Sequence, residues 1–458
     1  MKDIPHFSAT SAPVSAAPRP VLSVFDGAMI VVGIVIGAGI FRTPSMVAGV
    51  TGSIDWMLIA WVLGGVLSLI GALCYAEMAS AFPNAGGDYH FLTRAYGHDV
   101  SFFFAWARVA VITTGSIALL AFVFGDYMSR VLSLGPNSSA IYAAMTVVSL
   151  TALNIIGLRE SSRTQNILTI LEVSGLLLVA LAGVLATAPA AAPAAAVAAS
   201  TASSGIPPQF GLAMVFVLLT YGGWNEGAYI SAEVRGGPRA IVRTLVIAIV
   251  LITLVYVAFV LAVLNGLGLA GMQASKAVGA DVMQAAFGSF GAQLIGVIVG
   301  IATLTSINAT MIVGARTNYA LGRDWPQLGF MSRWQGEKSV PLIAFFVQGA
   351  IALALIAFGA LQKDGFSAMV EFTAPVFWFF FLLTGVALFV LRFREPTIAR
   401  PFKVPLYPIL PIIFVATCGY LLYSSVAYAQ VKQAVHISLY VMIAGLAAWA
   451  LLRLTRKR

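Results

Sequence analysis

Two glycine-rich stretches, each in the middle of a long apolar segment, are the parts of this sequence best suited to bind a ligand. The first is residues 33–41 (GIVIGAGIF), followed closely by Pro44, and the second is residues 218–226 (LLTYGGWNE). Glycine costs about 1 kcal/mol in a helix interior relative to alanine, so paired glycines indicate where a helix can open. Opened backbone exposes N–H and C=O groups that lipid cannot satisfy, and it is tolerated only where a cavity or a ligand supplies partners.

An opened helix offers two kinds of binding group. The half that begins after the break points its positive end at the gap and attracts a carboxylate, whereas the half that ends there presents free carbonyls that attract an ammonium or a metal cation. A site with both suits a zwitterion such as an amino acid, and matching breaks in two halves of a chain are typical of transporters. Close helix packing through Gly33 and Gly37 is the alternative for the first stretch, but two breaks at matching depth are less easily explained that way.

The composition places these stretches in a membrane. Of the 458 residues, 60% are hydrophobic and 9% are charged, whereas soluble proteins are about 45–50% apolar and about 25% charged. Uninterrupted apolar runs of about 20 residues span a bilayer as helices, and an outer-membrane barrel would instead alternate polar and apolar residues. The net charge of +9 does not indicate a nucleic-acid partner, because the basic residues lie singly or in small groups between the apolar runs, as topology determinants do.

The apolar runs predict twelve membrane-spanning helices. An even number places both termini on one side, and assigning them to the cytoplasm leaves twenty lysines and arginines inside and five outside, a strong positive-inside bias. The predicted runs are 21–50, 56–82, 100–130, 139–158, 164–187, 209–234, 241–266, 288–320, 340–361, 366–392, 405–427 and 434–453.

Two segments outside these runs are expected to carry no site. Residues 1–20 are polar and lack the apolar core of a signal peptide, so they are predicted to be a flexible cytoplasmic tail. Residues 188–208 are mostly Ala, Pro and Ser, which predicts a low-complexity outer loop.

Five stretches, spread over most of the chain, resemble one known family. They are VIGAGIFRTP (35–44), YAEMASAFPNAGGDYHFL (75–92), LLTYGGWNEGAYISAEV (218–234), INATMIVGARTNYALGRD (307–324) and FTAPVFWFFFLLTG (372–385). On these motifs the chain resembles the amino acid–polyamine–organocation transporters, especially their L-type and cationic amino acid branch.

The resemblance implies a fold and an activity. The fold would be a LeuT-type one, with a first five-helix repeat (21–187), an inverted second repeat (209–392), and a C-terminal part with two peripheral helices (393–458). The activity would be secondary active transport by alternating access in a bacterial inner (plasma) membrane. The substrate would be a neutral L-amino acid, or alternatively a polyamine or a cationic amino acid.

The resemblance also implies a set of substrate-binding residues. By position in the motifs, the amides of Ala38 and Gly39 would bind the substrate carboxylate. Leu219 lies where the family often has a bulky aromatic residue that closes over the substrate, so an aliphatic residue there predicts a looser lid. Trp224 and Asn225 would brace the second break. The carbonyls that would hold the amine are those of Val35, Leu219, Thr220 and Gly222, and the predicted site also includes Ile36, Gly37, Ile40, Tyr221 and Asn225.

Glu172 departs from the family pattern. Many members carry a lysine at its position, with the ammonium where a sodium ion lies in sodium-coupled relatives. A carboxylate at the helix centre costs about 2.5–3.5 kcal/mol when ionised, so it is expected to be protonated or paired. It could relay a proton, help to hold a sodium ion, or neutralise a second positive charge on the substrate. Glu226 is the second candidate proton carrier.

The eighth run contains a segment similar to a sodium site. Ala302, Thr305 and Ser306 match the spacing of a carbonyl and two hydroxyls in sodium-coupled relatives, and hard cations prefer such oxygen ligands. The alternative is that the hydroxyls of Thr305 and Ser306 bond back to their own helix. A coupling Na⁺ or H⁺ is therefore the one cofactor considered.

The other buried charges allow simpler interpretations. Glu77 and Glu233 are predicted near cytoplasmic helix ends, where they could pair with arginines such as Arg94 or Arg235 in an inner gate, or only stabilise packing. Glu371 is predicted to be solvated near the outer end of its helix, and Arg42 to snorkel towards the outer surface. No catalytic cluster or selectivity filter is visible, so neither an enzyme nor a channel is expected, and nothing indicates a partner subunit.

Overall fold

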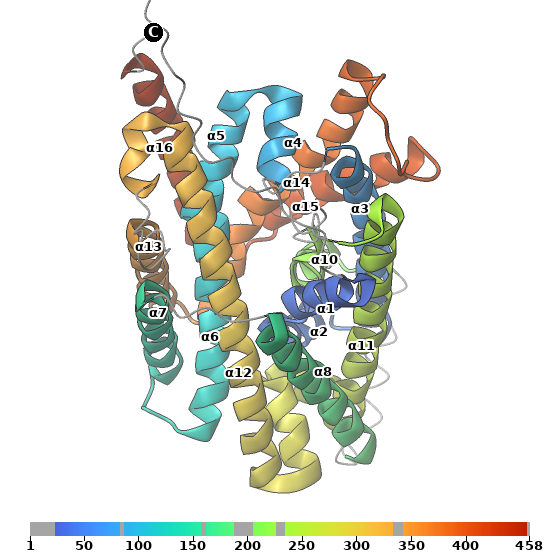
Figure 1. Cartoon of the computed structure of the whole chain (residues 1–458). Helices are drawn as coiled ribbons and strands as arrows, with labels where there is room; N and C mark the ends of the chain where they lie inside the picture. Colours follow the sequence, from blue (N-terminus) through green and yellow to red (C-terminus); the bar gives the residue numbers. More distant parts are fainter. Residues whose placement is uncertain are drawn as a thin grey trace, which may run out of the picture.

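The protein is a helical bundle with two interrupted segments near its middle. The computed structural model describes residues 23–82, 87–156, 162–186, 205–225, 234–332 and 342–455, and within these ranges it contains helices and connections but no β-strand. In this described part, ten helices are long and apolar enough to cross a membrane. Two shorter apolar helices, α1 (Val24–Val35) and α10 (Phe210–Thr220), lie near the middle of the bundle (Figure 1). The predicted all-helical membrane class is confirmed.

Most of the remaining elements fall in the predicted apolar runs, while α4 and η5 lie between runs. The first run continues from α1 into η1 (Ala38–Phe41) and α2 (Thr43–Thr51), and the third is made of α5 (His98–Ala107), the π-helical turn η2 (Arg108–Ile112) and α6 (Thr113–Val131). The others are α3 (Ile54–Ala81), α4 (Gly87–Tyr96), α7 (Ser138–Ile156), α8 (Ser162–Leu185), α11 (Gly237–Ala274), α12 (Val278–Asp324), η5 (Pro326–Ser332), α13 (Leu342–Ala360), α14 (Gly365–Arg394), α15 (Ile409–Ala427) and α16 (Lys432–Thr455).

The interrupted segments are enclosed by long helices. α1 packs against α8 and α11, while η1 contacts α6 and α12. α10 packs against α2, α3 and α15. The helices that surround both segments therefore belong to distant parts of the chain, as the colours of Figure 1 show.

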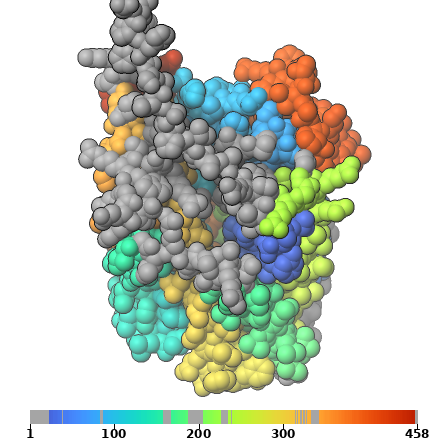
Figure 2. All heavy atoms as spheres, in the orientation of Figure 1, coloured from blue at the N-terminus to red at the C-terminus, as the bar shows by residue number. Residues whose placement is uncertain are grey.

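α1 begins at a well-formed cap. The Asp26 amide donates to the Ser23 hydroxyl at 3.1 Å and the Ser23 amide donates to the Asp26 carboxylate at 3.0 Å, which satisfies two amides that a helix start leaves free. Phe25 beside this cap is 69% exposed, and Figure 2 shows the α1 residues (dark blue) at the surface beside α11. α1 thus runs from the surface to a buried end at Val35.

The connection between α11 and α12 differs from the prediction. The sequence predicts that the spans end near residue 266 and restart near 288, but α11 and α12 continue as helix to within three residues of each other. Each helix has one non-helical residue, Gly268 and Gly288, both with φ of 66°. Only glycine adopts this left-handed conformation without strain, so these two residues bend the intervening segment out of the helix axes. We call residues 268–288 the α11–α12 hairpin.

Candidate functional site

The first broken segment opens where the sequence predicts. α1 ends at Val35, Gly37 is extended (φ −88°, ψ −174°), and a 3₁₀ turn, η1, leads into α2. The Gly37 amide donates to the Val35 carbonyl at 2.7 Å rather than to the Gly33 carbonyl, its partner in a continued α-helix. The end of α1 therefore presents carbonyls, and the start of η1 presents the amides of Ala38 and Gly39.

Gly33 and Gly37 have different surroundings. A methyl group on Gly33 would collide with the Thr169 hydroxyl of α8, so this glycine permits close packing of two helices. Around Gly37 the nearest side-chain atom to such a methyl group would be the Ser306 hydroxyl, at 3.5 Å. The packing interpretation applies to the first glycine of the pair, and the break occurs at the second.

The second broken segment turns at Tyr221. α10 ends at Thr220, and the Gly222 amide donates to the Leu219 carbonyl at 3.0 Å instead of continuing the α-helical pattern. The chain then forms a short turn through Trp224 and Asn225. The predicted Glu226 and Glu233 lie outside the described residues.

The two breaks lie against each other. A methyl group on Gly39 would contact the Thr220 side chain at 3.5 Å, and one on Gly223 would approach the Ile34 side chain at 2.9 Å. The Thr220 hydroxyl lies 2.7 Å from the Thr43 hydroxyl, which joins the end of α10 to the start of α2. The predicted site residues of the two segments are thus brought together, although their binding of a substrate stays a prediction.

Tyr256 of α11 bridges the two breaks. Its buried hydroxyl lies 2.8 Å from the Val35 carbonyl and 3.2 Å from the Thr220 carbonyl, two of the four carbonyls predicted to hold an amine. Tyr256 was not predicted from the sequence. Its position in the middle of an otherwise apolar helix could have indicated a polar contact there, because a buried tyrosine hydroxyl usually requires a hydrogen-bond partner.

Three side chains with buried polar atoms come from the helices packed around the end of α1. Thr169 and Glu172 lie one turn apart on the buried face of α8, and Ser306 of α12 lies beside Gly37. The Glu172 carboxylate and both hydroxyls lack a hydrogen-bond partner among the described residues. The Thr305 hydroxyl instead donates to the Ile301 carbonyl of its own helix at 3.0 Å, which is the alternative to a sodium site that the sequence left open for this residue. Ala302 is buried on the same helix.

The other predicted residues of the two broken segments make packing contacts and hydrogen bonds. Tyr221 is buried, and its hydroxyl donates to the Trp61 carbonyl of α3 at 3.1 Å. Trp224 packs edge-on against Tyr75, with ring centroids 5.1 Å apart. Asn225 donates to Asp88 of α4 at 3.4 Å. Leu219 is partly buried, and Ile36 and Ile40 are almost fully buried.

A small, mostly apolar cavity borders the second break. It lies between α10 and the helices α3, α14 and α15, and Gly222 forms part of its wall. Ser68 and Trp378 line it with polar atoms that have no hydrogen-bond partner in the described part of the chain. The end of α10 therefore has free space on this side. The lining residues are Leu67, Ser68, Leu218, Gly222, Trp224, Phe377, Trp378, Phe381, Phe414, Thr417 and Cys418.

Comparison with known families identifies the chain. The family model described as "Amino acid permease" matches residues 22–449, nearly the whole sequence. The chain belongs to the amino acid permease family. The resemblance inferred from the five sequence motifs is thereby confirmed.

Several curated relatives resemble the permease over most of their length. The mouse (Mus musculus) "b(0,+)-type amino acid transporter 1" is 26% identical over 92% of this chain and 85% of the relative. The rat (Rattus norvegicus) "Large neutral amino acids transporter small subunit 2" is 26% identical over 90% of this chain and 77% of the relative. The Bacillus subtilis "Serine/threonine exchanger SteT" is 27% identical over 86% of this chain and 89% of the relative.

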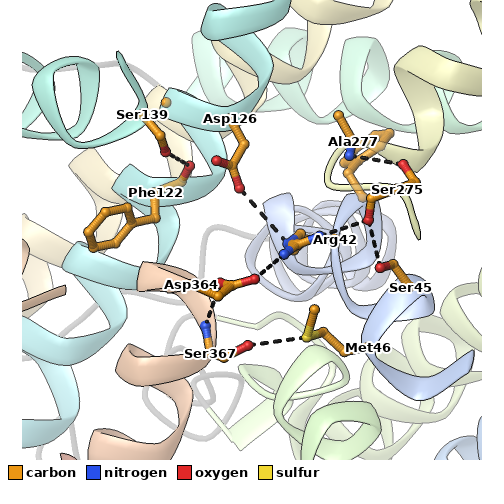
Figure 3. Close-up of polar contacts among 12 residues, drawn as sticks. Arg42, Ser45, Met46, Phe122, Asp126, Ser139, Ser275, Ala277, Asp364 and Ser367 are labelled. Carbon is orange, nitrogen blue, oxygen red and sulfur yellow. Dashed lines mark hydrogen bonds and ion pairs between the residues drawn. The ribbon is translucent and has the colours of Figure 1, made fainter. Parts of the chain in front are cut away.

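Arg42 of the permease does not snorkel, and that prediction is wrong. The side chain is 2% exposed and donates to the Ser275 carbonyl at 2.9 Å and to the Asp364 carboxylate, while its Nε lies 3.9 Å from Asp126 (Figure 3). These partners were not predicted from the sequence. Asp126 is a carboxylate inside an apolar run, and this position could have indicated that it needs a buried cationic partner.

For Glu77, the inner-gate prediction named the wrong partners, while its Glu233 part lies outside the described residues. Glu77 of α3 is buried and accepts two hydrogen bonds from Arg392 of α14, at 2.7 and 2.6 Å. It also accepts from the Val404 amide at 2.7 Å, and Arg400 lies 3.5 Å away. Its neighbours therefore come from α14 and the segment that follows, which are far from the predicted arginines in sequence.

Two further predicted charges have different partners. Arg94 of α4 pairs with Glu395 at 2.8 Å rather than with Glu77. Glu371 is buried rather than solvated, because it accepts hydrogen bonds from the Gln430 and Val431 amides at 3.0 and 2.6 Å. It thereby closes the connection between α15 and α16.

Proposed function

We propose that this permease is a secondary active amino acid transporter that works by alternating access. The contact between the two breaks carries the proposal, because it places the amides of η1 and the carbonyls of α1 and α10 in one buried region. Amides at a helix start favour a carboxylate and carbonyls at a helix end favour an ammonium. The substrate's α-carboxylate would bind at Ala38 and Gly39, and its α-amine at the carbonyls of Val35, Leu219, Thr220 and Gly222.

The proposed topology has twelve spans. Ten long helices would cross the membrane, and the two broken segments would complete the set. We propose the LeuT-type arrangement of two inverted five-helix repeats, 21–187 and 209–392, followed by the peripheral α15 and α16. The excess of basic residues on one side supports cytoplasmic termini, in a bacterial inner membrane.

Neutral L-amino acids are the proposed substrates. The names of two relatives refer to large neutral amino acids and to serine and threonine, which supports neutral amino acids as the substrate class. A polyamine or cationic amino acid is the second candidate. Glu172 favours it, because its buried carboxylate, which has no hydrogen-bond partner among the described residues, could neutralise a second ammonium.

The proposed coupling group is Glu172 with its neighbours. The carbonyls at the end of α1, the Glu172 carboxylate and the Ser306 hydroxyl could hold a Na⁺, which prefers oxygen ligands. Glu172 could instead carry a proton, for which the carboxylate alone suffices. If Glu172→Gln left transport and its pH dependence intact, Glu172 would have a structural role only.

Uptake into proteoliposomes tests the proposal. A panel of amino acids and amines is offered with and without Na⁺ and with and without a pH gradient. We expect uptake or exchange of neutral L-amino acids, whereas transport of amines alone would favour the second candidate. If no panel member is transported and none shifts the melting temperature, both candidates fail. Transport unchanged by Na⁺ removal would exclude the sodium site.

A further inference from the structure

Two arginines at the start of α11 lie on the face of the helix that points away from the protein. Arg239 and Arg243 are both exposed, and their spacing of four residues places them one turn apart on one side of the helix. Exposed apolar residues continue the same line along α11, at intervals of three, four or seven residues. We call these residues the α11 stripe, and they are Ile247, Val250, Leu251, Leu254 and Leu261.

The opposite face of α11 packs into the bundle. Residues such as Ala248, Ile252 and Tyr256 are buried, and α11 contacts α1, α3 and α8. From Arg239 onward this helix is long and apolar enough to cross a membrane. The α11 stripe therefore faces the acyl chains, and the two arginines lie where the span begins. Long arginine side chains keep their charge at the level of the lipid headgroups.

These two guanidinium groups differ from others at helix ends, because they have no partner in the described part of the chain. Neither Arg239 nor Arg243 makes a hydrogen bond or an ion pair there. Four arginines in the last turns of other helices do pair with carboxylates, namely Arg94, Arg130, Arg392 and Arg453. Like charges one turn apart on a helix repel each other, so an anion bound between Arg239 and Arg243 would stabilise this end of α11.

The first turn of α1 borders the same place. Thr244, which follows Arg243, donates to the Val24 carbonyl at 3.4 Å, and a methyl group on Gly27 would contact the Thr244 side chain at 3.0 Å. Phe25 in this turn is 69% exposed. Figure 2 shows α1 (dark blue) and the start of α11 (light green) side by side at the surface. A molecule bound at the two arginines would therefore lie next to the helix that leads to the first break.

We propose that Arg239, Arg243 and the α11 stripe bind one anionic phospholipid, which steadies the start of α1. The phosphate lies between the two guanidinium groups, whose planar forks suit phosphate oxygens. The acyl chains follow the stripe. A zwitterionic lipid is disfavoured because its ammonium group is repelled by the arginines, and free phosphate makes no contact with the stripe. The proposal concerns lipid binding and goes beyond the proposed function, so it does not depend on any substrate.

A lipid titration of the delipidated full-length protein tests the proposal. Native mass spectrometry measures the affinity of the first bound phosphatidylglycerol and of phosphatidylcholine with identical acyl chains. A basic residue near an anionic headgroup contributes about fivefold to affinity. We therefore expect phosphatidylglycerol to bind about 25-fold more tightly than phosphatidylcholine. Inorganic phosphate and glycerol phosphate, added at the same concentration as the lipid, should not displace it.

Three sets of variants assign this preference to the two arginines. Arg239→Gln and Arg243→Gln should each weaken phosphatidylglycerol binding by about fivefold, and the double variant by about 25-fold, while phosphatidylcholine binding stays the same. The corresponding lysine variants should keep most of the preference, because they keep the charge. Arg453→Gln is the matched control, since Arg453 is 62% exposed at a helix end but pairs with Asp99. It should leave phosphatidylglycerol binding unchanged.

Hydrogen–deuterium exchange tests the effect on α1. It is measured in the peptide that contains Val24, Phe25 and Gly27, with the protein in nanodiscs of either lipid. Exchange should be slower in phosphatidylglycerol than in phosphatidylcholine for the unsubstituted chain, because a bound ligand stabilises the structure it contacts. This difference should disappear in the double glutamine variant.

Each outcome supports or overturns one part of the proposal. Equal affinities for the two lipids, or unchanged phosphatidylglycerol binding in the folded double variant, overturn the site. An equal loss in Arg453→Gln overturns it as well, because the preference would then reflect overall charge. Displacement by inorganic phosphate overturns the assignment to a lipid. Equal exchange of the α1 peptide in both lipids overturns the effect on α1. If the double variant does not fold, the two single variants give the result.

Discussion

Removing the Tyr256 hydroxyl tests whether the bridge between the two breaks supports binding. Tyr256→Phe deletes the group that lies 2.8 Å from the Val35 carbonyl and 3.2 Å from the Thr220 carbonyl. The hydroxyl has one hydrogen to donate, so at most one full hydrogen bond and one weaker contact are lost. A neutral hydrogen bond contributes about 0.5–1.5 kcal/mol, which corresponds to a change in affinity of about two- to twelvefold.

Tyr221→Phe is the matched control. Tyr221 belongs to the predicted site, but its hydroxyl bonds the Trp61 carbonyl of α3 and not the end of α1. The variant therefore removes the same group from a neighbouring, equally buried ring and leaves the bridge between the breaks intact. Both variants should lower the melting temperature of the purified protein by similar, small amounts. Only Tyr256→Phe should raise the KM for amino acid exchange by the amount given above, because it alone loosens the two carbonyls relative to each other.

Equilibrium exchange in proteoliposomes measures both variants under the same conditions. The reasoning is refuted if Tyr256→Phe leaves KM unchanged, or if Tyr221→Phe raises it equally. A fall of KM in Tyr256→Phe would also refute the bracing role, since it would mean that the hydroxyl competes with the substrate amine for the carbonyls.

Three further predictions concern packing, a buried ion pair and pH. Gly33→Ala should destabilise the protein by about 1–3 kcal/mol through overpacking, and adding Thr169→Ala should recover most of this loss in a thermal-unfolding assay; no recovery would contradict the assigned contact. Glu77→Gln should cost about 3–5 kcal/mol, because it removes a buried carboxylate from two partly buried guanidinium groups. Glu395→Gln, at the more exposed pair with Arg94, should cost about 0–1 kcal/mol. Similar losses in the two variants would be evidence against the burial argument. Burial, and secondarily the neighbouring Arg94 guanidinium, lower the pKa of His90 from its usual 6.5. The folded protein therefore binds this proton less readily than the unfolded chain does, and it loses stability as pH falls below about 6.5. His90→Gln should flatten the melting temperature between about pH 7.5 and 5.5, and an unchanged slope would contradict the assignment.

The breaks and the membrane class followed from local properties of the sequence. Paired glycines in an apolar run weaken a helix wherever the run is placed, so the opening at Gly37 and the turn after Thr220 could be predicted without any tertiary information. The high fraction of apolar residues likewise predicted a membrane protein without any tertiary information. The α11–α12 hairpin was not predicted, because its helical turns lie in a stretch too polar to be read as part of a membrane span.

The partners of the charged residues could not be predicted, because they depend on long-range packing. Arg42 reaches Ser275 and Asp364 across more than 200 residues, and Glu77 meets Arg392 across 315. Their positions in the sequence suggested that Arg42 snorkels to the surface and that Glu77 pairs with an arginine near a cytoplasmic helix end. Tyr256 was missed for a related reason, since nothing in its own helix shows that two backbone carbonyls end beside it.

Competition by substrate fragments tests the central claim most directly. The claim is that backbone amides of η1 bind a carboxylate while carbonyls of the two broken segments bind an amine. Exchange of a radiolabelled neutral amino acid is challenged with the unlabelled amino acid, its carboxamide, its decarboxylated amine and its N-acetyl derivative. We predict that only the intact amino acid competes at low concentration, because each modified compound lacks one of the two charges. Equal competition by the decarboxylated amine or by the N-acetyl derivative would contradict the claim.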